Sequence, residues 1–131
     1  MTNPTADHDM VALLKRIYGK DREALFGNMR EDFTVHSPGQ NIIAGTYVGP
    51  EAFKAHMANM QALCGHSFKE ELQNTFLAND NWGLVVHRMT AERNGKHLDT
   101  WGFGLWRFED GKLTDHWESV GDQAHWDDFW S

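Results

Sequence analysis

Residues 84–120 read LVVHRMTAERNGKHLDTWGFGLWRFEDGKLTDHWESV, and this segment decides the fold. Apolar and polar residues alternate along most of it, which is typical of half-buried β-strands. The dipeptides Asn94-Gly95 and Asp110-Gly111 interrupt the alternation, and both suit two-residue hairpin turns because their residues tolerate positive φ. The segment therefore predicts three antiparallel strands joined by two tight turns.

The two turns also predict which residues lie opposite each other, since turn type and loop length fix the register of a hairpin. Counting outward from the turns gives these pairs: His87 with Gly102, Met89 with Thr100, Gly104 with Trp117, and Trp106 with Asp115. One face of the sheet then carries Val85, His87, Met89, Ala91, Leu98, Thr100, Gly102, Gly104, Trp106, Phe108, Leu113, Asp115, Trp117 and Ser119. We interpret this mainly apolar face, with its two glycines, histidine and carboxylate, as a core face that contains a pocket.

Length and composition restrict the class of protein. A chain of 131 residues is the size of a single domain, and its 24% charged content is ordinary. The net charge of −7 argues against a surface for nucleic acid or for an anionic membrane, because either needs a basic patch. The only cysteine, Cys64, allows no internal disulfide and favours a reducing cytoplasm, and we expect it to be a buried, inert thiol.

The remaining sequence predicts helices and one further long strand. Helical spacing of apolar residues indicates helices within residues 10–19 after a cap at Asp7 or Asp9, within residues 21–29, and within residues 50–65. A short strand is expected at residues 33–36, and a short helix or tail at residues 123–131. Residues 66–77 alternate, and the even positions, which include Glu70, are predicted to face the core. The predicted fold class is α+β, with a strongly curved antiparallel sheet wrapped around three N-terminal helices.

Three motifs resemble a known family: HSPG at residues 36–39, AGTYVGPE at residues 44–51, and DGKLTDHWE at residues 110–118. They are similar to the SnoaL-like, polyketide cyclase-like branch of the nuclear transport factor 2-like superfamily. The resemblance implies a cone-shaped α+β barrel with an apolar pocket, and a homodimer. The superfamily contains isomerases, cyclases, dehydratases and non-catalytic binding proteins, so the fold does not decide the function.

The residues of ketosteroid isomerases are missing at the matching positions. Ser37 stands where those enzymes have a general-base aspartate, and Gly104 stands where they have the aspartate of the oxyanion hole. Their helical tyrosine aligns near Leu13. The resemblance therefore does not imply ketosteroid isomerase chemistry.

Other relatives use acid–base residues for which this chain offers candidates. Polyketide cyclases of this type place an acid/base aspartate on the last strand, where Asp115, Glu118 and Asp122 are available. Alternation along that strand predicts Asp115 inward, and Glu118 outward. Dehydratase relatives use a histidine and a carboxylate inside the cone, for which the candidates are His66, His87, Glu70 and Asp115.

The residues that we predict to be catalytic are His87, Asp115 and Glu70. His87 lies on the inward face with Gly102 opposite, which leaves space beside a ring that can exchange a proton near neutral pH. Asp115 is predicted to face inward, where it could act as a base or orient the histidine. Glu70 is predicted to lie nearer Met89 than His87, so no direct contact between Glu70 and His87 is expected. The alternative for each is an ordinary buried polar group with a satisfied hydrogen bond.

Further residues are candidates for substrate binding. They are Trp106, Trp117, Met89, Phe53, Met57, Thr100, Gly102 and Gly104. Plain core packing is the alternative for this set. Tyr18 could point its hydroxyl into the mouth of the pocket or lie at the surface. No metal or cofactor is expected, because the histidines show no paired spacing on one helix and no glycine-rich phosphate loop precedes a helix.

The opposite face of the predicted sheet carries Trp101, Phe103 and Leu105 among charged residues. An apolar stripe of this kind suggests a partner surface, and the family resemblance implies that the partner is a second copy of the chain. Three functions stay open: an acid–base enzyme of the cyclase, isomerase or lyase type acting on an apolar carbonyl or polyketide-like substrate, a non-catalytic domain that binds a small hydrophobic ligand, and a protein-interaction module.

Overall fold

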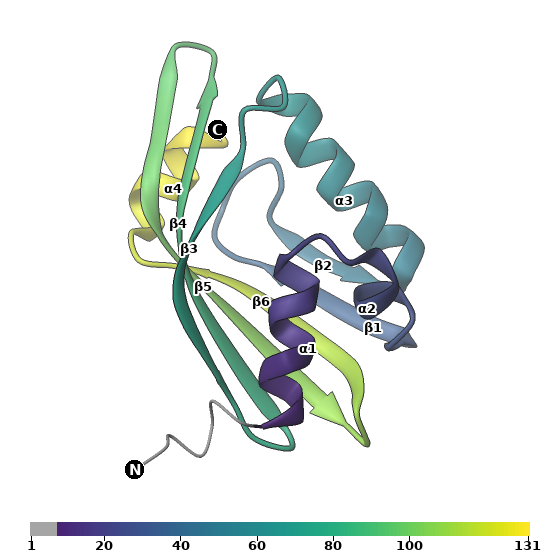
Figure 1. The fold of residues 1–131 in the computed structure, drawn as a ribbon. Coiled ribbons are helices and arrows are strands. Elements are labelled where there is room, and N and C mark those ends of the chain that lie inside the picture. The colour runs from purple at the N-terminus through teal and green to yellow at the C-terminus, as the bar shows by residue number, and fades with distance from the viewer. Residues whose placement is uncertain (1–7) are drawn as a thin grey trace.

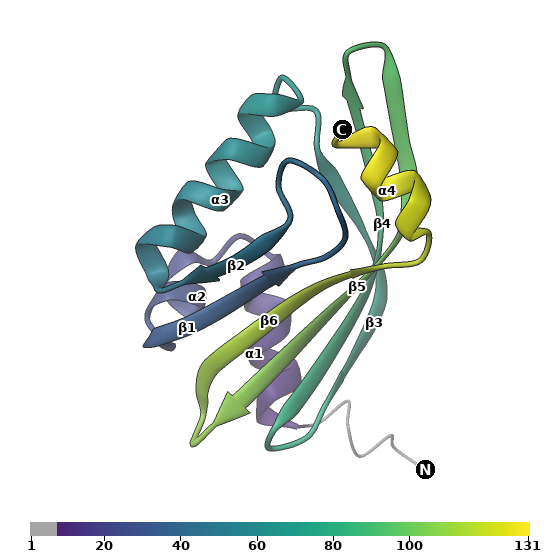
Figure 2. The ribbon, with the colours of Figure 1, turned by 180° about the vertical axis from the view of Figure 1, so that it is seen from behind.

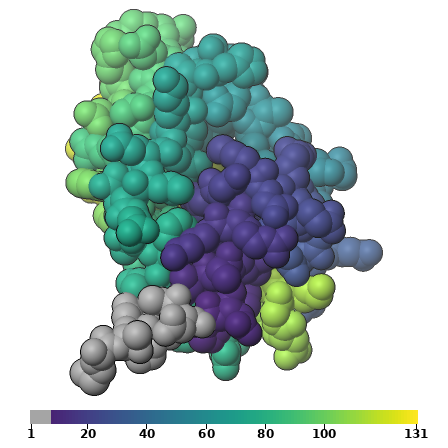
Figure 3. Space-filling view, in the orientation of Figure 1, coloured from purple at the N-terminus to yellow at the C-terminus, as the bar shows by residue number. Residues whose placement is uncertain are grey.

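The computed structural model describes residues 8–131 (Figure 1). The elements in chain order are α1 (Asp9–Tyr18), α2 (Arg22–Phe26), β1 (Met29–Ser37), β2 (Gly45–Val48), α3 (Pro50–Leu63), β3 (Lys69–Ala78), β4 (Trp82–Arg93), β5 (Lys96–Glu109), β6 (Lys112–Val120) and α4 (Gln123–Phe129). Helices α1, α2 and α3 lie on one side of a strongly twisted sheet (Figure 1). In the space-filling view the purple N-terminal helices lie across the front of the molecule (Figure 3).

The sheet has six strands in the order β2-β1-β6-β5-β4-β3. It is curved but does not close, so β2 and β3 are its two edges and the expected barrel is incomplete. The prediction of an antiparallel sheet is wrong at one pair, because β1 runs parallel to β6. The description of the fold as a sheet wrapped around three N-terminal helices is not confirmed, although the helix predicted within residues 50–65 is present as α3. Only α1 and α2 precede the sheet, since α3 connects β2 to β3 and α4 follows β6 and packs against β5 (Figure 2).

The first helix begins and ends for local reasons. The side chain of His8 caps it by accepting a hydrogen bond from the backbone N–H of Met10 at 3.1 Å, so the predicted cap at Asp9 is wrong and Asp7 lies outside the described residues. Gly19 ends the helix as expected. Met29, predicted to belong to the second helix, instead begins β1. A short turn after Gly19 leads directly from α1 into α2.

The hairpin of β4 and β5 has the predicted register. Arg93 pairs with Lys96, and the count continues without interruption to His87 opposite Gly102 and beyond. Asn94 has a φ of 51° and Gly95 a φ of 77°, the left-handed conformation that this turn requires. The buried residues of both strands accordingly lie on one face.

The hairpin of β5 and β6 has a different register from the one predicted. Phe108 pairs with Leu113, but the next paired residue on β6 is Asp115, opposite Arg107, so Thr114 is an extra residue in a β-bulge. A slip of one residue exchanges the two faces of a strand. Beyond Thr114 the predicted pairs are wrong: Trp106 lies opposite His116, and Gly104 lies opposite Glu118.

The helices and the sheet enclose two clusters of buried apolar side chains. One cluster lies between α1 and the strands β1, β4, β5 and β6. It includes Leu14, Phe33 and Phe108, which are fully buried. The other joins α3 and α4 to β4 and β5, and it contains Cys64, which is 4% exposed as the sequence predicted. None of the helices within residues 8–131 has both the length and the hydropathy that crossing a bilayer requires.

Candidate active site

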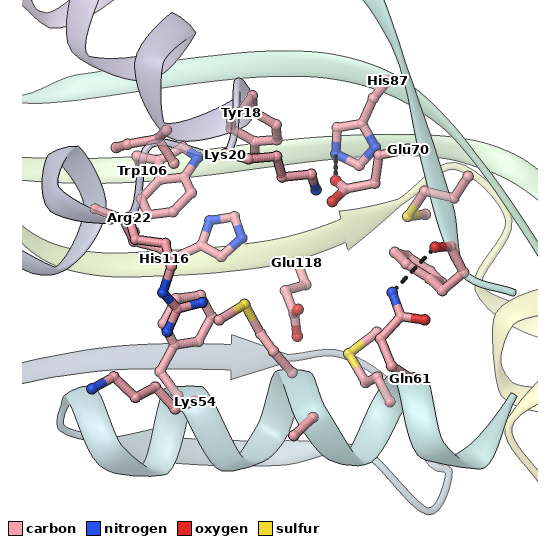
Figure 4. A pocket seen from close by; sticks show the side chains of 18 of the residues that line it. Tyr18, Lys20, Arg22, Lys54, Gln61, Glu70, His87, Trp106, His116 and Glu118 are labelled. Carbon is pink, nitrogen blue, oxygen red and sulfur yellow. Dashed lines mark hydrogen bonds and ion pairs between the residues drawn. The ribbon is translucent and has the colours of Figure 1, made fainter. Parts of the chain in front are cut away.

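A cavity of about 680 Å³ lies between the helices and the inner face of the sheet, a size typical of small-molecule sites (Figure 4). Its walls come from α1, α2, α3, the strands β3 to β6, and α4. Apolar lining residues are Ile17, Leu25, Phe26, Phe53, Met57, Ala58, Met60, Phe68, Met89, Trp106 and Trp126. Polar lining residues are Tyr18, Lys20, Asp21, Arg22, Lys54, Gln61, Glu70, His87, His116, Glu118 and Ser119. The site is thus an apolar cavity with several titratable groups.

The first histidine–carboxylate pair joins the edge strand β3 to β4. His87 Nε2 lies 3.3 Å from Glu70 Oε2, with the side chain of His87 6% exposed and that of Glu70 30% exposed (Figure 4). Glu70 pairs with Met89 along the strands, as predicted, but its side chain is long enough to reach the diagonal neighbour. The prediction that Glu70 and His87 make no contact is therefore wrong.

Gly102 has a different role from the one predicted. A Cβ at this position would collide with the His87 ring and would lie 2.9 Å from the sulfur of Met89. The space that glycine provides is filled by His87 itself and is not open cavity. Gly102 therefore fixes the place of the imidazole beside Glu70.

The surroundings of this pair shift both pKa values. Burial raises the pKa of Glu70 from 4.5 to about 7, with the charge of Lys20 opposing the rise and that of Glu118 adding to it. Burial lowers the pKa of His87 from 6.5 to about 4, helped by His116 and opposed by Glu118. At neutral pH the imidazole is neutral and Glu70 is close to half protonated, so Glu70 can both accept and donate a proton.

A second histidine–carboxylate pair joins α3 to β6. The ring of His56, with its side chain fully buried, donates from Nε2 to Glu118 Oε1 at 2.7 Å. The ring of Tyr47 stacks on His56 with centroids 4.2 Å apart, and its hydroxyl donates to the carbonyl of Ile43. Glu118 projects into the cavity between α3 and His116 (Figure 4). This short contact ties the helix to the sheet and orients the carboxylate.

His116 lies on β6 between the two pairs. Its Nδ1 donates to the carbonyl oxygen of Leu105 at 3.1 Å, which leaves Nε2 as an acceptor in the neutral ring. The ring stacks on Trp106 with centroids 3.9 Å apart. Burial lowers the pKa of His116 to about 4, with the charge of Glu118 and the hydrogen bond to Leu105 opposing the change. His116 is therefore a neutral, weakly basic group at neutral pH.

Tyr18 points inward, which decides between the two predictions made for it. Its hydroxyl oxygen accepts a hydrogen bond from the indole N–H of Trp106 at 3.1 Å, and it occupies the space that Gly104 leaves without a Cβ. Burial and the charge of Glu70 raise the pKa of Tyr18 well above its ordinary value, so the phenol stays protonated. Its hydroxyl hydrogen meets no acceptor among residues 8–131 and is free to bind a ligand oxygen.

Comparisons with known proteins identify the family. The family model described as the SnoaL-like domain matches residues 10–116. The chain belongs to the SnoaL-like family. It is similar to the solved structure of Bal32a from a soil-derived mobile gene cassette, with 30% identity, a TM-score of 0.79 and 93% of each chain covered. No curated protein matches significantly.

Two solved structures described as putative polyketide cyclases share the fold of this SnoaL-like protein. The one from Jannaschia sp. CCS1 is 14% identical with a TM-score of 0.70, and the match covers 92% of this chain and 90% of that one. The other, IdmH from Streptomyces antibioticus, is 14% identical with a TM-score of 0.61, and the match covers 87% and 93%. At this identity the likeness concerns the fold alone.

Most of the predicted site residues line the cavity of the SnoaL-like chain. These are His87, Glu70, Trp106, Met89, Phe53 and Met57. Thr100 is buried but is not part of the lining, and Gly102 and Gly104 only make room for His87 and Tyr18.

Asp115 and Trp117, however, are absent from the cavity because the bulge at Thr114 turns them to the outer face. There Asp115 Oδ2 lies 2.9 Å from His36 Nε2, and the ring of Trp117 stacks on that of His36.

His116 and Glu118 face inward and His56 supports Glu118, and alternation counted from the Asp110-Gly111 turn predicts none of these positions. Glu118 was considered as a candidate, but alternation from the turn placed it outside. Alternation shows only that Asp115 and Glu118, three residues apart, face opposite sides of the strand, and the bulge at Thr114 decides which of them faces the cavity. Within residues 8–131, no three His, Cys, Asp or Glu side chains come together as a metal site.

Proposed function

We propose that this SnoaL-like protein is a small-molecule enzyme of the cyclase, isomerase or lyase type, acting by proton transfer on an apolar carbonyl or polyketide-like substrate. The observation that carries the proposal is the Glu70–His87 pair at the wall of an apolar cavity of about 680 Å³. A carboxyl group with a pKa of about 7 is suited to exchange protons at neutral pH. The family supports a role of this type at a general level.

Glu70 is the proton-transfer group in the proposed reaction. Its carboxylate removes a proton from the carbon next to the substrate carbonyl, and the electron pair of the broken C–H bond moves to the carbonyl oxygen to form an enolate. His87, neutral at this pH, holds the carboxylate in place. The contact of 3.3 Å is slightly longer than a strong hydrogen bond, as is common in sites without a bound ligand.

Tyr18 and Glu118 are the complementary groups. The protonated phenol of Tyr18 donates its free hydrogen to the developing enolate oxygen. Glu118, held by His56, is the second acid–base residue in this proposal, the role predicted for Asp115. Return of the proton to another atom gives an isomer, attack on a second carbonyl closes a ring, and loss of a β-substituent gives a lyase product. None of these steps needs a cofactor.

Proton exchange at carbon tests this proposal before the natural substrate is known. The protein is incubated in D₂O with 2-tetralone, a fused-ring ketone, and loss of the α-proton signals is followed by NMR. We expect exchange above the buffer rate, and a fall of about 100-fold or more in Glu70→Gln. The matched control is Glu71→Gln, because Glu71 is the exposed neighbour on the same strand. Equal exchange by the wild type and Glu70→Gln would contradict the role of Glu70.

A non-catalytic binding domain is the second candidate function. It is favoured by the aromatic and methionine lining from Phe26, Phe53 and Met57, which suits a flat apolar ligand without any chemistry. Titration calorimetry with 2-tetralone separates the two candidates. Binding without proton exchange would favour the binding domain.

The outer face of the sheet is proposed as a homodimer surface. Trp101 is 42% exposed, and Trp82 on the neighbouring strand is 43% exposed. Phe103 and Leu105 are half-buried beside them. Large apolar side chains exposed on one face are typical of a protein–protein contact.

A further inference from the structure

Three basic side chains line the cavity of a chain whose net charge is −7. Lys20 follows α1, Arg22 begins α2, and Lys54 lies in the first half of α3. Lys20 and Arg22 are close in the sequence and Lys54 is distant from them, and the fold brings all three side chains to one cavity (Figure 4). The lining of the cavity therefore carries three cations alongside the carboxylates Asp21, Glu70 and Glu118.

Arg22 and Lys54 share one aromatic ring. The guanidinium carbon of Arg22 lies 5.1 Å from the ring centroid of Phe26, and the ammonium of Lys54 lies 4.8 Å from the same centroid. Two like charges near one ring repel each other, and an anion bound by both would offset that repulsion. Their cation–π contacts hold both side chains at the cavity and leave their N–H groups available to a ligand.

Neither cation is strongly neutralised by the protein. Among residues 8–131, no carboxylate lies within ion-pair distance of Arg22, and neighbouring Asp21 binds Arg16 instead, at 3.0 Å. Within the same residues, the one carboxylate that pairs with Lys54 is that of Glu51, at 3.2 Å, and because Glu51 is 89% exposed the pair contributes little. The Arg22–Lys54 side of the cavity therefore carries net positive charge.

The opposite side of the cavity holds two acidic groups, Glu70 and Glu118, whereas the third acidic lining residue, Asp21, is paired with Arg16. Glu70 and Glu118 belong to the two histidine pairs, and apolar side chains, including Phe53 and Met57, complete the lining. A ligand that fits both sides would be amphipathic, with an oxyanion at one end and its apolar body against the lining. Lys20 lies near Glu70 and is directed toward it, so it belongs to the acidic side (Figure 4).

We infer that Arg22 and Lys54 form an anion subsite, and that the ligand of this cavity carries an oxyanion such as a carboxylate next to an apolar ring body. The inference rests on the proposed function only in that the cavity binds a small molecule. It adds the charge of the substrate and the two residues that select it. Arg22 is suited to this task because its planar guanidinium can bind both oxygens of a carboxylate.

Calorimetry with paired ligands tests the anion subsite. 1-Naphthylacetate and 1-naphthylacetamide have the same ring body and differ in charge, and 1-naphthyl phosphate provides a second oxyanion. We expect the acid to bind about tenfold more tightly than the amide, since each exposed ion pair contributes a few-fold. We expect this preference to disappear in the double variant Arg22→Met/Lys54→Met, with the affinity for the amide unchanged.

Lys15→Met is the matched control. Lys15 lies 5.8 Å from the ring centroid of Phe76, the same type of contact as Lys54 makes with Phe26, but it is outside the cavity lining. The variant changes the net charge without touching the subsite, so the preference for the acid should stay. Salt gives a test without substitution, because added NaCl should weaken binding of the acid and not of the amide.

The outcomes separate this inference from the proposed function. A preference for either oxyanion that depends on Arg22 and Lys54 supports the subsite, even if the protein exchanges no α-proton. Equal binding of acid and amide overturns the subsite and leaves the proton-transfer proposal to its own test. Absence of binding by all three ligands overturns the subsite for ligands of this size. A preference that persists in the double variant also overturns it.

Discussion

The two histidine–carboxylate pairs face one cavity but differ in length and burial. Glu70 and His87 are 3.3 Å apart, with Glu70 30% exposed and with both pKa values shifted toward the neutral forms. His56 and Glu118 are 2.7 Å apart, with a fully buried histidine that also stacks on Tyr47. The first pair is arranged for proton exchange, whereas in the second pair His56 joins α3 to β6 and orients the Glu118 carboxylate at the cavity.

The difference follows from where each pair lies in the fold. Glu70 is on the edge strand β3, so its carboxylate meets the cavity and can exchange protons with a ligand. Glu118 is on β6, between β1 and β5, and its partner comes from a helix packed over the sheet. The short, buried contact between His56 and Glu118 contributes to stability. The longer contact between His87 and Glu70 leaves the Glu70 carboxylate able to exchange a proton with a ligand.

The largest effect on stability is expected from breaking the second pair. In His56→Leu, Glu118 loses a hydrogen bond donor while 17% exposed, so we expect the free energy of unfolding to fall by about 2–3 kcal/mol. Urea denaturation followed by circular dichroism measures the change. His36→Leu is the control, since it breaks the more exposed pair with Asp115 and should cost about 1 kcal/mol or less. Equal losses of unfolding free energy in both variants would contradict a larger structural contribution of the His56–Glu118 pair than of the His36–Asp115 pair.

A smaller effect, dependent on pH, is expected from the first pair. The pKa of Glu70 in the folded protein, about 7, is above the ordinary 4.5, so folding favours the protonated carboxyl group. The contribution of protonated Glu70 to the free energy of unfolding is fully present below pH 4.5 and is lost as pH rises through 7. Glu70→Gln keeps the neutral form at every pH. The free energy of unfolding of the variant, relative to that of the wild type, should therefore rise by about 1–2 kcal/mol between pH 5 and pH 8. This figure is reduced for the partial exposure of Glu70.

Unfolding by urea at several pH values measures this gain. His87, with a folded pKa of about 4, stays neutral in the folded state across the range and titrates alike in both unfolded chains. Glu71→Gln serves as the control and should show a difference that does not change with pH. A constant difference for Glu70→Gln would contradict the raised pKa of Glu70.

The smallest effect on the fold is expected on the outer face, away from both pairs. Trp101→Asp places a charge on the proposed dimer surface, and because Trp101 is 42% exposed the free energy of unfolding of the monomer should change by about 0.5 kcal/mol or less. Light scattering should show monomers in place of dimers. A dimer mass that is unchanged in the variant would contradict the proposed surface and leave the two cavity pairs unaffected.

The local sequence by itself determined the register of the β4–β5 hairpin and the inward face of strands β3 and β4. The Asn94-Gly95 turn sets the register of β4 and β5, because the turn and the pairs that it creates are adjacent in the chain. Alternation placed Glu70 and His87 on the inward face for the same reason. The contact between these two side chains was missed because it is diagonal, and reach across a diagonal depends on side-chain conformation.

Only the tertiary structure decided the register of β6. This strand pairs with β5 on one side and in parallel with β1 on the other, where Thr34 lies beside Asp115 and Val35 beside His116. The bulge at Thr114 satisfies both neighbours, and β1 is distant in sequence, so the adjacent turn carries no information about it. That one extra residue moved Asp115 out of the cavity and brought His116 and Glu118 into it, because side chains on a strand change face at every residue.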